Sequence, residues 1–238
     1  MKLPLSDCAG NLSAHCTKPG VLSLPALPSV GVSARYAPGM KRIAITSEKG
    51  GVGKSTLAFN LAGALAERGQ TVLIDEDERV KSCLLWSALA PIDFKCVGPD
   101  QAAQVLPGAA FLVVDSEGRP AVEDLLELAG SFDRVLIPCG TSRLELQSGL
   151  SLWRALKAGG NVESVRLVIT KALPIGRAGQ EAKEALQAAG VSTLETVVRR
   201  FAAHERAADQ GGLVRDVRDP KAADAWADIQ DVAREVLA

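Results

Sequence analysis

Residues 41–65 read KRIAITSEKGGVGKSTLAFNLAGAL, and this order of residue types predicts a strand, a glycine-rich turn and a helix. The apolar residues 43–45 form the strand, and Leu57, Leu61 and Leu65 recur every four positions, as on one face of a helix. Three glycines between these elements leave successive backbone N–H groups free to surround a phosphate. The helix adds its own unpaired N–H groups and the positive end of its dipole.

Two lysines flank the glycines, which predicts a phosphate-binding loop of an unusual kind. Lys54 is expected to reach the β- and γ-phosphates of a nucleotide, and the Ser55 hydroxyl to ligate Mg²⁺. The common pattern has glycine six residues before this lysine, where the chain has Glu48, so the additional Lys49 is distinctive. A turn that binds nothing is the alternative interpretation. The predicted nucleotide contacts are Gly50, Gly51, Val52, Gly53, Lys54, Ser55 and Thr56.

The composition indicates one globular domain without a long-range preference for nucleic acid. A chain of 238 residues suffices for one sizeable α/β domain. Its net charge is −1, so any binding to nucleic acid must be local. Five scattered cysteines predict neither a disulfide framework nor a paired metal site, which indicates the reducing cytosol. No apolar run approaches the roughly 18 residues of a membrane-spanning helix.

Residues 1–39 differ from the rest and are expected to be a disordered extension, because they contain no periodic apolar pattern. Cys8, His15 and Cys16 offer three metal ligands without a fourth, which disfavours a metal site there. Residues 40–238 are expected to form the P-loop domain.

Strands and helices alternate from Met40 onward, which predicts a doubly wound, mostly parallel sheet with helices on both faces, a three-layer α/β fold. Trp153 is expected in the core. The last helix is expected to have Asp219 as its N-cap and Pro220 in its first turn. The expected strands are 43–45, 71–74, 111–114, 134–138 and 165–170, and the expected earlier helices are 54–68, 80–89, 120–129, 144–157 and 178–189.

Acidic residues follow two of these strands at the sheet edge where ligands bind in such folds. Asp115 follows four apolar residues, which is the Walker B form whose carboxylate holds the Mg²⁺ shell. Asp75 and Asp77 follow the other strand, and one of them is expected to position the attacking water. The alternatives are a turn or N-cap for Asp115 and a solvated acidic turn for the pair.

These motifs resemble the ParA/MinD family of deviant Walker ATPases over nearly all of residues 41–238. KGGVGKST is similar to the family's Walker A motif, VLIDEDE to its strand ending in Asp-x-Asp, and VVDSEG to its second acidic strand. The resemblance implies an ATP hydrolase with ATP and Mg²⁺ as cofactors. It implies that Lys49 crosses a homodimer interface to the partner's nucleotide, and that Lys54 and Asp77 act in hydrolysis. The residues expected around the metal are Ser55, Asp75 and Asp115.

The chain departs from the family pattern at three places. Glu78-Arg79 replace a common Pro-Gln, and residues 115–118 replace a common Asp-Thr-Pro-Pro, in segments that act as switches. The Asp-x-Asp-Glu form also resembles the VirC-type ATPases of conjugative DNA transfer. Thr170-Lys171 stand where the family has an asparagine that reads adenine, which leaves that contact unassigned.

A segment near the C-terminus resembles the ParA stretch whose arginines touch DNA. Five arginines oppose three acidic residues between positions 198 and 218, and a solvated face is the alternative interpretation. A dimer would double this patch and give salt-dependent phosphate contacts without base reading. The predicted DNA contacts are Arg199, Arg200 and Arg218.

The leading hypothesis is a cytoplasmic, nucleoid-associated ParA-like partition ATPase. It would dimerise with MgATP, bind DNA nonspecifically and be released by a ParB-like partner. A VirC-like accessory of DNA transfer uses the same machinery. A MinD-like membrane switch would require a basic amphipathic last helix. That helix instead carries Asp224, Asp228, Asp231 and Glu235, so no membrane contact is expected. An amide ligase would need longer substrate loops, and a nitrogenase-like ATPase a cysteine just after Asp115.

Overall fold

A computed structural model describes residues 39–47, 49–77, 79–118, 120–160 and 162–238. Almost all of the predicted disordered extension, residues 1–39, lies outside these described residues. The ATPase domain predicted at 40–238 corresponds to the part of the chain that the structure describes.

Strands and helices alternate along the described chain, as the sequence predicts. The strands are β1 (Lys41–Ile45), β2 (Thr71–Asp75), β3 (Lys95–Val97), β4 (Phe111–Asp115), β5 (Arg134–Cys139), β6 (Val165–Ala172) and β7 (Thr193–Arg199). The helices are α1 (Lys54–Ala66), α2 (Ser82–Ser87), the 3₁₀ turn η2 (Pro99–Gln101), α3 (Ala102–Val105), α4 (Val122–Ser131), α5 (Arg143–Gly159), α6 (Ala178–Ala188), α7 (Ala202–Gln210) and α8 (Ala222–Leu237).

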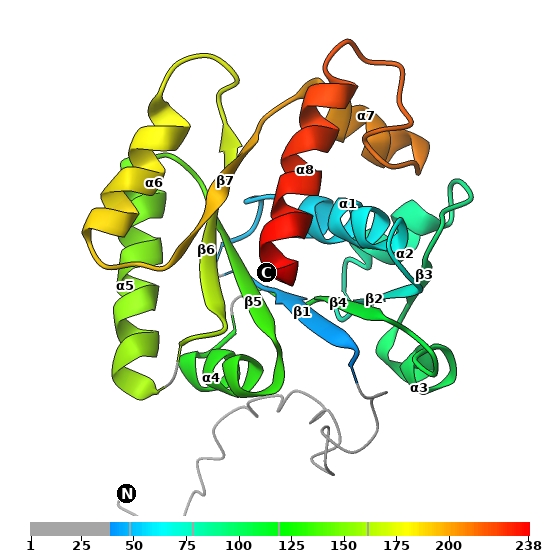
Figure 1. The fold of residues 1–238 in the computed structure, drawn as a ribbon, viewed down its shortest axis with the longest axis horizontal. Coiled ribbons are helices and arrows are strands. Elements are labelled where there is room, and N and C mark those ends of the chain that lie inside the picture. Colours follow the sequence, from blue (N-terminus) through cyan, green and yellow to red (C-terminus); the bar gives the residue numbers. More distant parts are fainter. Residues whose placement is uncertain (1–38, 48, 78, 119, 161) are drawn as a thin grey trace, which may run out of the picture.

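The strands form one sheet in the order β3-β2-β4-β1-β5-β6-β7, and each neighbouring pair runs parallel. This confirms the predicted three-layer α/β class. β1 lies between β4 and β5, with Ile45 beside both Asp115 and Leu136. The carboxyl ends of β1, β4 and β2 therefore meet at one edge of the sheet (Figure 1).

Alternating side chains divide the buried residues into two cores, one on each face of the sheet. Ile43 and Ile45 point to the core shared with α1, α2, α7 and α8, whereas Ala44 belongs to the core shared with α4, α5 and α6. Because both faces are covered, the central strands are apolar along their whole length. Trp153 is buried in the second core, as predicted.

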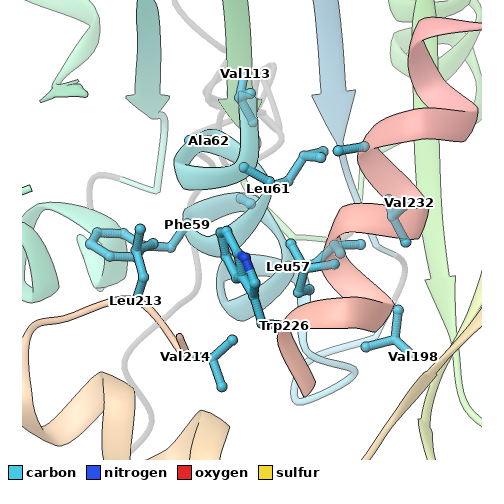
Figure 2. Packing of buried hydrophobic residues seen from close by; sticks show 14 of the residues in the cluster. Leu57, Phe59, Leu61, Ala62, Val113, Val198, Leu213, Val214, Trp226 and Val232 are labelled. Atoms are coloured by element: carbon cyan, nitrogen blue, oxygen red, sulfur yellow. The ribbon is translucent and has the colours of Figure 1, made fainter. Parts of the chain in front are cut away.

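Helix α1, which begins at the phosphate-binding loop, lies at the centre of the first core. Every residue from Leu57 to Leu65 is buried, so α1 is enclosed on all sides. Figure 2 shows residues of α8 and of the chain just before it packed around this helix. Phe59 stacks on Trp86 of α2 with ring centroids 4.2 Å apart. This enclosure fixes the start of α1, and hence the loop, relative to the sheet.

Two helices begin later than the sequence predicts, because side chains hold local turns ahead of them. The helix expected at 80–89 is α2, which starts at Ser82 after Lys81 adopts a left-handed φ of 54°. The prediction of Asp219 as N-cap of the last helix was wrong. Asp219 Oδ1 accepts a hydrogen bond from the Lys221 amide at 2.7 Å, which makes a turn, and α8 begins at Ala222.

The sequence analysis did not identify β3, β7 or α7. β3 has three residues, too short for a periodic signal. β7 and α7 lie within the segment interpreted only by its arginines, although Thr193, Thr196, Val197 and Val198 are typical strand formers.

Candidate nucleotide-binding site

The loop between β1 and α1 has the backbone conformation that a phosphate cradle requires. Gly51 and Gly53 have φ angles of 78° and 92°, which side-chain-bearing residues rarely adopt. A Cβ on Gly50 or Gly51 would meet no atom within 4 Å, so the loop faces open space. Gly53 is the N-cap of α1, and no side chain caps that helix end. The N–H groups at the start of α1 are therefore available to an anion.

Lys54 and Asp115, predicted to serve the phosphates and the metal, contact one another. Lys54 Nζ lies 2.5 Å from Asp115 Oδ1. The Asp115 side chain is fully buried and that of Lys54 is 11% exposed, so the pair is desolvated. The other carboxylate oxygen, Oδ2, lies 3.3 Å from Cys83 Sγ. The predicted meeting of the loop lysine with the Walker B aspartate is thus confirmed by geometry.

Asp75 has a structural role that the sequence analysis did not foresee. Its Oδ2 accepts hydrogen bonds from the amides of Cys83 and Leu84 at 2.8 and 3.1 Å, which caps the start of α2. Its Oδ1 accepts one from the Asp77 amide at 3.2 Å. Asp75 is also the register partner of Asp115. In this structure it joins α2 to the metal edge, and direct metal ligation by Asp75 stays a prediction.

Asp77 is half-buried and organises the turn before α2. Its Oδ1 accepts hydrogen bonds from the amides of Arg79 and Val80 at 3.2 and 3.0 Å. The alternative reading as an acidic turn therefore describes this structure, and a role of Asp77 with water stays a prediction that requires these bonds to be released.

Burial and neighbouring acids make this edge strongly electronegative. Burial, with Asp115 and Asp75, raises the pKa of Glu76 to about 7, and Lys54 partly opposes this. Burial and Asp115 also raise the pKa of Asp75. Clustered carboxylates resist being charged together, and a divalent cation relieves that repulsion.

Lys49 lies on the opposite side of the loop from Lys54. It is exposed and lines a cavity of about 20 Å³ together with Val52, Cys139 and Glu145. Its charge also reaches the Cys139 thiol, where it partly opposes the increase in pKa that burial causes. Lys54 therefore turns toward β4, whereas Lys49 lies beside β5 and α5.

The residues at this site fit ATP with Mg²⁺. The open glycine loop and the free start of α1 suit phosphate oxygens, and oxygen donors of Asp115 and Ser55 suit a hard divalent cation. Ser55 and Thr56 are half-buried in the first turn of α1, where phosphate and metal contacts are expected. When bound, Mg²⁺ neutralises charge on the phosphates. Lys54 must then exchange Asp115 for phosphate oxygens.

The predicted DNA-contacting arginines have unequal freedom. Arg199 is held by Asp228, with Nη2 2.7 Å from Oδ1 and Nε 3.0 Å from Oδ2, and its guanidinium lies 5.0 Å from the Phe201 ring centroid. The prediction that Arg199 contacts DNA is therefore corrected to a structural role. Arg200 and Arg218 are exposed, and Arg200 has a single long contact of 3.5 Å to Glu205.

Several site residues were missed by sequence reasoning. Cys83 and Glu76 contact or face Asp115 only because α2 and β2 fold over it. Thr170 donates a 2.8 Å hydrogen bond from Oγ1 to the Val52 carbonyl, across 118 positions. No local pattern signals these contacts, although the charge of Glu76 between two aspartates was visible.

A strand, a glycine loop with a free helix start, and a buried lysine–aspartate pair at the end of a neighbouring strand define a P-loop nucleotide-binding domain. The comparisons narrow this class. A family model described as the CobQ/CobB/MinD/ParA nucleotide binding domain matches residues 43–214, and the chain belongs to this family.

The relatives agree with this assignment. Maintenance of carboxysome distribution protein A from Gloeobacter kilaueensis is 30% identical over 220 residues, which cover 87% of this chain and 97% of that protein. The structure of apo McdA from Cyanothece has a TM-score of 0.61 at 15% identity, covering 84% of this chain and 100% of that one. MinD from Aquifex aeolicus has a TM-score of 0.61 at 17% identity, covering 83% and 96%. At these identities the structural likeness shows the fold.

The chain is thus a ParA/MinD-family ATP hydrolase that uses ATP and Mg²⁺. Members of the family dimerise with ATP and bind partner proteins. Within the described residues, no helix is both long and apolar enough to cross a membrane.

Proposed function

We propose that the chain is a ParA-type positioning switch of the cytoplasm. MgATP joins two copies face to face, the dimer binds nucleoid DNA without sequence preference, and hydrolysis stimulated by a ParB-like partner releases it. Hydrolysis acts as the timer of the switch. The geometry that carries this proposal is the divergence of the two loop lysines.

Lys54 is paired with Asp115 inside its own subunit, where it can serve the phosphates in cis. Lys49 lies exposed on the other side of the loop, and no ion pair of Lys49 occurs among the described residues. A second cation that is not needed by its own nucleotide is well placed to contact the nucleotide of a facing copy. This supports an ATP-dependent homodimer in which the triphosphates lie at the interface.

The nature of the cargo follows from the relatives rather than from the site. The relative from Gloeobacter kilaueensis is named for the distribution of carboxysomes, which favours a protein body as cargo over the plasmid that the sequence analysis first suggested. A VirC-like role in DNA transfer would use the same switch. In each case, an adaptor protein must link the cargo to the ATPase.

The proposed DNA contacts are Arg200 and Arg218, because both side chains are exposed. The test is retention of the protein on immobilised random DNA with ATP, ADP or no nucleotide, at two salt concentrations. Retention only with ATP, weakened by salt, supports the proposal. Equal retention in all three states would contradict it. ATPase rates with the product of the neighbouring gene then test the partner.

A MinD-like membrane switch is the second candidate, and one feature speaks against it. The apolar residues of α8 are buried against the core around α1, so this helix has no free apolar face for a bilayer. Co-sedimentation with anionic vesicles tests this candidate, and MgATP-dependent binding would favour it over DNA.

A further inference from the structure

The end of strand β6 is attached directly to the phosphate-binding loop. Thr170 is buried, and its Oγ1 donates to the Val52 carbonyl at 2.8 Å. The next residue, Lys171, has a left-handed φ of 54°. Its side chain passes over the loop, with Cε 3.7 Å from the position that a Cβ on Gly53 would occupy. The stem of an exposed lysine therefore lies beside the last loop glycine.

The sheet order indicates which part of a nucleotide would meet this lysine. The acids and Lys54 gather at β4 and β2, on one side of β1, which makes that side the metal and γ-phosphate end. A nucleotide that begins there and crosses the loop extends toward β5 and β6 on the other side. Lys171 at the end of β6 consequently lies on the nucleoside side of the loop.

This part of the site is poor in groups that read a base edge. The Thr170 hydroxyl is already engaged by the Val52 carbonyl. Residues 171–176 read KALPIG and contain no carboxylate or carboxamide. Leu173 and Ile175 are 64% and 89% exposed, so the segment presents apolar rather than hydrogen-bonding side chains.

We propose that the Lys171 side chain is the platform on which the purine base of the nucleotide stacks, and that the site discriminates weakly between adenine and guanine. A lysine ammonium and its stem bind any aromatic face, because the attraction depends on the π-system and not on the base edge. A site that reads edges by hydrogen bonds discriminates by about 10⁴-fold, whereas an apolar contact surface gives only about tenfold to 200-fold. This inference rests on the nucleotide-binding assignment and is independent of the cargo.

The test is calorimetric titration of the full chain with MgATP, MgGTP and Mg-tripolyphosphate. In the unaltered chain we expect dissociation constants for ATP and GTP within about tenfold of each other. Lys171→Gly suits the left-handed backbone and removes the stem, so it should weaken both nucleotides by about tenfold and leave tripolyphosphate binding unchanged. Lys171→Met retains most of the stem and should lose less than Lys171→Gly.

Lys157→Ala, an exposed lysine of α5, is the matched control and should change none of these constants. A preference for ATP over GTP beyond about 10³-fold would overturn the weak selectivity. An equal loss of tripolyphosphate binding in Lys171→Gly would show that Lys171 serves phosphates, and would overturn the platform. Neither result bears on DNA retention, so failure here is distinguishable from failure of the positioning function.

Discussion

The ammonium of Lys54 lies 2.5 Å from a carboxylate oxygen of Asp115, at the junction of the phosphate-binding loop and strand β4. Without a nucleotide, the phosphate-binding lysine and the metal-binding aspartate neutralise one another. Because both are desolvated, each is needed to keep the other from being an unpaired buried charge. The site is therefore organised before ATP arrives, and binding must exchange this pair for phosphate and metal contacts.

Lys54→Met should destabilise the nucleotide-free protein by about 3 kcal/mol, because it leaves the fully buried Asp115 carboxylate unpaired. Adding Asp115→Asn to that variant should recover most of the loss. Urea denaturation of the single and double variants measures both effects. The exposed Lys221–Asp224 pair is the control, and Lys221→Ala should cost less than about 1 kcal/mol. A double variant as unstable as the single one would contradict this account.

Lys49→Ala should retain MgATP binding but lose ATP-dependent dimerisation. The reason is that Lys49 lies on the β5 side of the loop, away from Lys54 and Asp115. Light scattering after size-exclusion chromatography, with and without MgATP, measures the oligomeric state. Lys157→Ala should dimerise normally. If Lys49→Ala formed a normal dimer with ATP, the role across the interface would be abandoned.

Arg199→Ala and the pair Arg200→Glu with Arg218→Glu should have opposite signatures. Arg199 is bound to Asp228 by several hydrogen bonds, so its loss should destabilise the fold by about 1–2 kcal/mol. The exposed pair should leave stability unchanged and reduce ATP-dependent DNA retention at least tenfold, which removal of phosphate contacts produces. Thermal denaturation and DNA retention are compared for both variants. Unchanged retention in the charge-reversed pair would refute these contacts.

His204 should make the protein sensitive to mild acid. Both of its ring nitrogens are buried without a hydrogen-bond partner among the described residues. Burial lowers the pKa of His204, and the nearby Asp228 and Glu205 only partly oppose this. The folded state thus favours neutral histidine. Its contribution is intact above the unfolded pKa of about 6.5 and is lost as pH falls through the lower folded pKa.

The measurement is the free energy of unfolding in urea at pH 7.5 and at pH 5. His204→Leu should show a smaller loss of stability between these values than the unaltered chain. Lys157→Ala again provides a control, since it should follow the unaltered chain at both pH values. An identical acid sensitivity in His204→Leu would assign the effect to other groups.

Local pattern was sufficient for the class of fold and for the loop. The alternation of apolar strands with amphipathic helices reflects the periodicity that burial on a sheet or helix face imposes, and it identified five strands of the sheet within a few residues. The glycines and Lys54 were identifiable because a phosphate cradle is made from consecutive residues. The aspartate after β4 was found because strand ends share one edge.

Sequence alone therefore determined which residues line a phosphate loop and which strand ends carry acids, since these depend on neighbours along the chain. Only the tertiary structure decided how those groups are used. It paired Lys54 with Asp115, turned Asp75 into the cap of α2, enclosed Arg199 with Asp228, and laid Lys171 over Gly53. Each of these contacts joins separate elements, and hydrogen bonds and ion pairs of this kind form wherever packing brings desolvated partners together.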